Sequence, residues 1–115
     1  METRSATPPA NIYEAGGELS VAVPIPGAHP GHVEVTVQAQ HLRVAATCKY
    51  PQGRQHYLRR DWQVGAWTLD LELPKAVDPT RSRATLHLGV LVVMAPVSGG
   101  QNGAEHRPRV EGPDT

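Results

Sequence analysis

Six histidines and a single cysteine are the side chains of this 115-residue chain best suited to binding a metal ion. His29 and His32 stand three positions apart, but both lie in a turn rich in proline and glycine. Structural zinc sites usually rely on cysteines at short, regular spacings, and Cys48 has no second cysteine to join it. We therefore predict neither a metal site nor a bound cofactor.

Nucleophilic chemistry would have to come from Cys48 or from a serine. Cys48 stands beside Lys49, which favours the thiolate form, but the sequence offers it no base and no orienting partner. The serines considered, none of which has a nucleophile-elbow context, are Ser20, Ser82 and Ser98. The sequence has no phosphate-cradling glycine loop and no carboxylate pair in a recognisable catalytic setting. We therefore predict that the protein is not an enzyme.

The charge balance argues against polyanionic partners. Eleven basic and eleven acidic residues give a net charge of zero, which does not favour duplex nucleic acid or an anionic membrane. Residues 49–66 are locally basic, and we interpret the nearby Trp62 and Trp67 as core or interface anchors. No apolar run approaches the roughly 20 residues of a membrane span, and no segment resembles a signal peptide. With one cysteine and hence no internal disulfide, we expect a soluble cytoplasmic protein.

The elements that must carry these residues are β-strands, because apolar residues recur at every second position. Proline and glycine separate the apolar sets, and no window shows a convincing helical period. The alternating sets are Leu19, Val21 and Val23; Val33, Val35 and Val37; Leu42, Val44 and Ala46; and Trp67, Leu69, Leu71 and Leu73. Each set predicts one strand face that is turned towards an aliphatic core.

A lone glycine, Gly89, interrupts the apolar run from Ala84 to Pro96. Glycine inside a strand usually marks a bend, a bulge or a close backbone approach. We therefore predict that Gly89 separates two short strands, or two halves of one strand, and that this segment forms an edge of the fold. With a further short strand at Ile12–Tyr13, the strands number about seven to eight, which predicts an all-β sandwich of two sheets.

The composition divides the chain into one domain and two tails. Residues 1–10 are polar and proline-bearing, and residues 97–115 are rich in glycine, proline and charge, so both are expected to be disordered. The folded domain is predicted over residues 11–96. Inside it, residues 49–65 form a long polar excursion with one possible edge strand, and excursions of this length usually contact something outside the domain.

The order and spacing of several motifs resemble the bacterial type of the small heat shock protein family (Hsp20, α-crystallin domain). The motifs are Pro26-Gly27; Val33-x-Val35-x-Val37; Leu42-x-Val44; Tyr57-Leu58-Arg59-Arg60-Asp61; Gly65-Ala66-Trp67; Leu73-Pro74; and Ala84 with Gly89-Val90-Leu91 and Pro96. The resemblance covers about residues 9–96. It implies that the sandwich is immunoglobulin-like, as in the α-crystallin domain.

The chain departs from the family pattern at several positions. Pro24, Leu69 and Leu88 stand where the family commonly has an acidic residue, an arginine, and an Asn or Asp. The tail also lacks the Ile-x-Ile or Ile-x-Val tripeptide that links dimers into large assemblies in the family, and offers only Val110. We therefore expect a dimer or a small oligomer.

The resemblance implies an ATP-independent chaperone, a holdase, which binds partly unfolded client proteins under stress and limits their aggregation. Exposed apolar grooves and strand edges would bind the clients. The candidate client-binding residues are Val33, Val35, Val37, Val90 and Val92. Those on the inward face of a strand would instead belong to the core, so only outward-facing members could meet a client. The residues that resemble the family's dimer-exchange loop are Tyr57, Leu58, Arg59, Arg60, Asp61 and Trp62. The family signature residues are Pro26, Gly27, Leu73, Pro74, Ala84, Gly89 and Leu91.

Two alternatives stay open at this point. The missing tail motif and arginine favour a co-chaperone or adaptor similar to the CS-domain family, which would bind one folded partner. A metal- or redox-responsive protein would use the histidines and Cys48, with disulfide cross-linking under oxidation. The expected partners under the first hypothesis are non-native client proteins, a second copy of the chain, and other small heat shock proteins.

Overall fold

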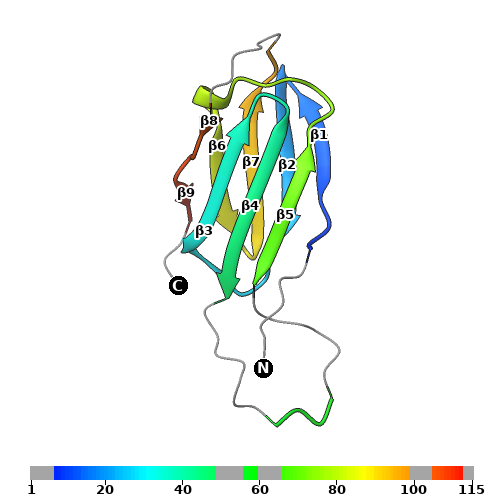
Figure 1. Ribbon diagram of the computed structural model, residues 1–115, viewed down its shortest axis with the longest axis vertical. Helices are drawn as coiled ribbons and strands as arrows, with labels where there is room; N and C mark the ends of the chain where they lie inside the picture. Colours follow the sequence, from blue (N-terminus) through cyan, green and yellow to red (C-terminus); the bar gives the residue numbers. More distant parts are fainter. Residues whose placement is uncertain (1–6, 49–55, 60–65, 99–104, 113–115) are drawn as a thin grey trace.

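The computed structural model describes residues 7–48, 56–59, 66–98 and 105–112. These residues form strands stacked in two layers (Figure 1). The elements are β1 (Asn11–Ala15), β2 (Glu18–Pro24), β3 (Ala28–Gln38), β4 (His41–Cys48), β5 (Trp67–Glu72), a short 3₁₀ helix η1 (Pro79–Arg81), β6 (Arg83–His87), β7 (Val90–Pro96), β8 (Glu105–His106) and β9 (Val110–Glu111).

The strands pair into a five-stranded sheet in the order β1-β2-β7-β6-β9 and a four-stranded sheet in the order β5-β4-β3-β8. Every neighbouring pair is antiparallel except β6 and β9, which run parallel. The result is the all-β sandwich of two sheets that the sequence predicts. The described residues contain no helix long and apolar enough to cross a membrane.

The core lies between the sheets and consists of aliphatic side chains. Val23, Val44 and Leu91 have exposed fractions of 0%. The register places Val35 opposite Val44 on the inner side of the four-stranded sheet. Successive side chains of a strand point to opposite faces, so the period-two apolar sets turn inward and the residues between them turn outward. The strand faces predicted from the sequence are thereby confirmed.

Two tight hairpins join consecutive strands of the five-stranded sheet. Gly16 and Gly17 connect β1 to β2 with φ angles of 62° and 77°, and Leu88 and Gly89 connect β6 to β7 with φ angles of 53° and 79°. Positive φ at both central residues is typical of a type I′ turn, which matches the right-handed twist of the flanking strands. Gly89 therefore separates two strands, as predicted.

The edges of the sheets differ from the sequence prediction. β7 lies between β2 and β6, so Val90–Pro96 is a central strand and the prediction of an edge there was wrong. Strand order is set by pairing between distant segments, and the local pattern of β7 carries no information on its neighbours.

The C-terminal tail also differs from the prediction of disorder over residues 97–115. Val97 bridges to Val77, and Glu105–His106 and Val110–Glu111 form β8 and β9 on the two sheets. Two side chains of this segment, Pro108 and Val110, are buried. Their burial supplies the apolar contact that a disordered tail lacks.

Candidate functional site

The Leu88-Gly89 hairpin is held against the turn that follows β2. The amide of Ile25 donates a hydrogen bond to the carbonyl oxygen of Gly89 at 2.8 Å. A Cβ added to Gly89 would lie 3.4 Å from the Cα of Pro26, so the two backbones pack closely at this point. Two parts of the family signature that are far apart in the sequence therefore meet at one end of the sandwich.

The remaining signature residues have structural positions. Gly27 adopts a φ of 91°, which favours glycine, in the turn where the amide of Ala28 donates to the carbonyl of Ile25. Leu73 is buried, and its amide donates to the carbonyl of Gln40 at 2.8 Å. Pro74 follows it on the surface, while Ala84 and Leu91 are buried in the core. These residues shape and fix the fold, and none of them is placed for chemistry.

The dimer-exchange residues are only partly described. Tyr57, Leu58 and Arg59 lie on the surface, and the side chain of Leu58 is 92% exposed. The predicted residues Arg60, Asp61 and Trp62 lie outside the described residues. The side chain of Cys48, at the end of β4, lies outside them as well.

The client-binding candidates separate into two groups. Val33, Val35 and Val37 point into the sandwich and are buried, because they occupy the inward positions of β3. The prediction that they meet clients is therefore wrong for the folded domain. Val90, at 37% exposure, and the half-buried Val92 occupy outward positions of β7 and remain accessible.

The outer face of the five-stranded sheet carries apolar side chains along its central strand β7, whereas β6 beside it presents Arg83, Thr85 and His87 on the same side. Its register places Val92 opposite Ala22 and Val90 opposite Pro24. The same outward side carries Met94, and Tyr13 of the edge strand β1 is 52% exposed. We call this surface the apolar face: Tyr13, Ala22, Pro24, Val90, Val92 and Met94. A charged pair borders it, with Arg83 Nη2 and Glu18 Oε2 2.6 Å apart.

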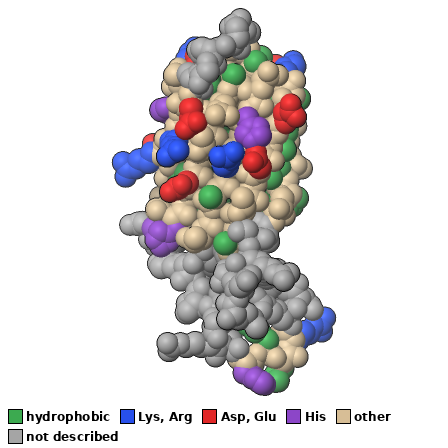
Figure 2. All heavy atoms as spheres, viewed as in Figure 1, with side chains coloured by type: hydrophobic (Ala, Val, Ile, Leu, Met, Phe, Trp, Pro, Cys, Tyr) green, Lys and Arg blue, Asp and Glu red, His purple; other side chains and the backbone are tan. Residues whose placement is uncertain are grey.

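The outer face of the four-stranded sheet is polar by contrast. His41 and Asp70 interact across β4 and β5, and Arg43 Nη2 lies 3.6 Å from Asp70 Oδ2. Figure 2 shows acidic, basic and histidine side chains gathered over β3, β4 and β5. This polar face consists of Glu34, Thr36, Gln38, His41, Arg43, Ala45, Thr47, Thr68, Asp70 and Glu72. The two outer surfaces of the sandwich therefore have opposite character.

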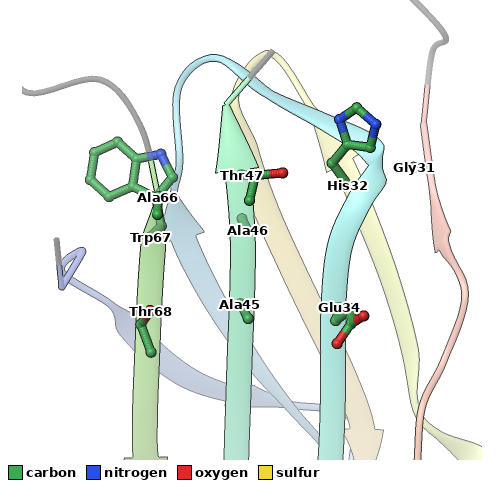
Figure 3. Close-up of a pocket in the computed structure, with 9 residues that line it drawn as sticks. All are labelled: Gly31, His32, Glu34, Ala45, Ala46, Thr47, Ala66, Trp67 and Thr68. Atoms are coloured by element: carbon green, nitrogen blue, oxygen red, sulfur yellow. The ribbon is translucent and has the colours of Figure 1, made fainter. Parts of the chain in front are cut away.

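An open pocket of about 510 Å³ lies on the four-stranded sheet where β4 ends and β5 begins (Figure 3). His32 and Trp67 stand on its two sides, and small residues of β4 lie between them. The indole Nε1 of Trp67 is buried and has no hydrogen-bond acceptor among the described residues. The lining combines one carboxylate, Glu34, with an exposed histidine and offers no nucleophile activated by a base.

The histidines do not converge on one site in the part of the chain that the structure describes. The rings of His29 and His32 lie 5.3 Å apart, and Nδ1 of His29 accepts a hydrogen bond from the amide of Gly31 at 3.0 Å. No group of three or more His, Cys, Asp or Glu side chains among the described residues is placed to hold a metal ion.

One feature with functional potential was missed in the sequence, namely the segment Glu105–Gly112. Its exposed residues alternate with His106, Pro108 and Val110, which point towards the sandwich. The signal was a period-two pattern in a charged, proline-containing tail. The pattern was too short, with only Pro108 and Val110 strongly apolar, to predict strands.

Two mainly antiparallel sheets packed face to face, with a tight hairpin fixed to the turn before β3, define an immunoglobulin-like β-sandwich domain. The family model described as Hsp20/alpha crystallin family matches residues 11–110, and the chain belongs to that family. A search of curated proteins found no match to the sequence.

Solved structures of small heat shock proteins share the fold. The hspA from Xanthomonas axonopodis has a TM-score of 0.74 at 20% identity, over 85% of this chain and 100% of that one. A small heat-shock protein from Xylella fastidiosa has a TM-score of 0.71 at 21% identity, over 88% and 94% of the two chains. A mutant hsp14.1 from Sulfolobus has a TM-score of 0.67 at 28% identity, over 84% and 80%.

Proposed function

We propose that this chain is an ATP-independent holdase that binds partly unfolded proteins on its apolar face and limits their aggregation. The observation that supports this most directly is the contrast between the two outer surfaces. Val90, Val92 and Met94 point away from the core, where a solvated sheet normally carries polar residues, as the polar face does. Apolar side chains that a sheet turns outward, with charged residues beside them, are typical of an interaction site.

The binding step needs no covalent chemistry. Unfolding proteins expose apolar side chains, and burial of these against Val90 and Val92 would be driven by the hydrophobic effect, worth roughly 25 cal/mol per Å². The charged pair of Arg83 and Glu18 at the border would keep the free protein soluble. A chaperone of this kind acts as a binding protein and not as an enzyme.

We propose that two copies form a dimer by strand exchange, as in the bacterial type of the family. β1 is the outermost strand of its sheet and pairs only with β2 among the described strands, so its other edge is open to a further strand. The exposed Tyr57 and Leu58 belong to a segment that is suited to pair with β1 of a second copy. Burial of Leu58 against the partner would account for its near-complete exposure in the single chain.

The proposal also covers the cellular compartment of the protein and its assembly partners. We place it in the cytoplasm, because a single cysteine excludes an internal disulfide and clients of a holdase arise where proteins are made. We also propose that it co-assembles with other small heat shock proteins through the same open edge of β1.

The test combines light scattering of a heat-aggregating model protein, with and without equimolar chaperone, and size-exclusion chromatography with multi-angle scattering. Suppressed aggregation by a dimer or small oligomer is the expected result. A folded monomer that suppresses nothing would overturn the holdase proposal and favour an adaptor that resembles the CS-domain family and binds one folded partner.

A further inference from the structure

The tip of the β6–β7 hairpin presents an apolar side chain that the packing of the domain does not use. Leu88 is 87% exposed, and its φ of 53° lies in the left-handed region that leucine rarely adopts. Gly89 beside it is fixed by the hydrogen bond from Ile25 and by close packing against Pro26, so the tip is held in this position. Strained residues of this kind gather at functional sites. We call Leu88 and Gly89 the hairpin tip, and it has the properties of a contact point for another molecule.

The pocket on the four-stranded sheet is a hollow with a floor of small side chains. Ala45, Ala46 and Thr47 form the floor, and His32 and Trp67 stand on its two sides (Figure 3). Its volume of about 510 Å³ lies within the range that is usual for binding pockets, and none of the described side chains fills it. The pocket can therefore receive a side chain of the size of leucine together with the backbone next to it.

The hairpin tip and the pocket lie at the same end of the sandwich, where β2, β4 and β6 end and β3, β5 and β7 begin (Figure 1). The register fixes this arrangement, because Pro24 lies opposite Val90 next to the tip and Ala46 lies opposite Trp67 in the pocket. The two features nevertheless belong to different sheets, and the core lies between these sheets. Leu88 therefore cannot reach the pocket of its own chain. A hairpin tip that enters the pocket must come from a second copy.

The shared end also determines what kind of assembly such a contact makes. A projection and a pocket at opposite ends of a molecule would join copies head to tail into an open chain. With both at one end, a two-fold axis can place the tip of each copy in the pocket of the other, which closes the assembly at two copies. The chain thus carries both halves of a self-complementary contact.

We propose that the hairpin tip and the pocket form a second self-association contact, in which Leu88 of each copy fills the pocket of the other. The contact is distinct from strand exchange, because neither β1 nor Leu58 takes part in it, and it requires no unfolding client. Two side chains in two pockets bury far less surface than the roughly 1,200–2,000 Å² of a stable interface. The association is therefore weak and increases with protein concentration. Together with strand exchange, it makes a tetramer from two dimers.

Two variants of the full chain remove the two halves of the contact separately. Leu88→Asn removes the apolar side chain and suits the positive φ of the turn. Ala45→Gln fills the pocket floor with a longer polar side chain from an exposed position of β4. The matched controls are Thr85→Asn on β6 and Thr36→Gln on β3, which lie on the same two sheets outside the tip and the pocket.

Multi-angle scattering over a series of protein concentrations measures the mass. The mass of wild type and of both controls should rise by up to about twofold, whereas Leu88→Asn and Ala45→Gln should not rise. An equimolar mixture of these two variants still holds one intact tip and one intact pocket, so it should associate although neither variant does so alone. A wild-type mass that does not change with concentration, a loss of association in only one of the two variants, or a mixture that behaves like its components would overturn the proposal.

Two further measurements separate this contact from the other proposals and from failure of a variant to fold. The concentration series is repeated in Leu58→Asp, where strand exchange is disfavoured, and the rise in mass should persist there; its disappearance would overturn a contact independent of Leu58. In wild type, the indole Nε1–H resonance of Trp67 should shift with concentration, because Leu88 of a second copy then lies against this wall of the pocket. A resonance that does not move while the mass rises would place the contact elsewhere and overturn the proposal.

Discussion

The amide of Ile25 and the carbonyl oxygen of Gly89 are joined by a hydrogen bond of 2.8 Å that ties the β6–β7 hairpin to the turn after β2. Ile25 is fully buried, so this bond lies at the margin of the core. The residue next to Gly89, Leu88, is 87% exposed and has a φ of 53°. A branched apolar side chain in the left-handed region, with almost no burial to offset the strain, is an uncommon combination.

Leu88→Asn should stabilise the domain. Asparagine tolerates positive φ better than leucine, so relief of strain should add about 1 kcal/mol to the free energy of unfolding. A gain of that size raises the melting temperature by about 4–8 °C in a domain of this size. The melting temperature is measured by recording circular dichroism during thermal unfolding. Leu88→Ala removes the exposed side chain but keeps the strain, and an equal gain in that variant would contradict the explanation.

Val90→Lys should weaken chaperone activity without unfolding the domain. The side chain is 37% exposed at the end of the apolar face next to the β6–β7 hairpin, so lysine can reach solvent while its charge disrupts contact with apolar client segments. Several-fold more protein should be needed for the same suppression of light scattering. Thr68→Lys on the polar face is the control and should behave as wild type. If Val90→Lys and Thr68→Lys lost the same amount of aggregation suppression, the result would argue against the apolar face as the binding surface.

Leu91→Ala should destabilise the domain strongly. Leu91 is 0% exposed in the central strand β7, and truncation of a buried leucine costs about 2–5 kcal/mol. Its neighbour Val90 points outward, so Val90→Ala should lower the free energy of unfolding by only about 0.5 kcal/mol. Urea unfolding of both variants gives the comparison. A similar loss of unfolding free energy in Leu91→Ala and Val90→Ala would mean that the inward and outward sides of β7 are assigned incorrectly.

Leu58→Asp should convert the proposed dimer to a monomer. The side chain is 92% exposed in the single chain, so the substitution has no packing to disturb there, whereas a buried aspartate would disfavour the exchanged strand. Size-exclusion chromatography with multi-angle scattering measures the mass. His56→Asp adds the same charge two residues away and should leave the dimer intact. A dimer that persists in Leu58→Asp places the interface elsewhere.

The sequence predicted the side-chain directions of the strands more reliably than their neighbours. Val35 and Leu91 turn inward because alternation is a local property of a strand. The central position of β7 depends on its pairing with β2, which is distant in the sequence. The residue pattern within β7 cannot predict this pairing. The valines of β3 were named as client-binding candidates, but their alternation also predicted an inward strand face, and the structure shows that they fill the core.

The C-terminal segment Glu105–Gly112 shows a second limit. Pro108 and Val110 are two apolar residues in a charged tail, and they become buried only because distant strands of the two sheets lie beneath them. The apolar face, by comparison, could have been inferred in part. Val90, Val92 and Met94 alternate with the buried Leu91 and Val93, so an apolar run without polar residues already implied that both sides of β7 carry apolar side chains.

Because the segment Glu105–Gly112 is the last described part of the chain and pairs with one sheet through β8 and with the other through β9, it also influences how the domain responds to mechanical load. A pulling force on the C-terminus reaches the two pairs of β9 before those of β8, and both before β7. Two residue pairs hold β9 and two hold β8, whereas seven join β2 to β7, so this segment should detach before the two central strands separate. Pulling at the tail can therefore release this segment without unfolding the core.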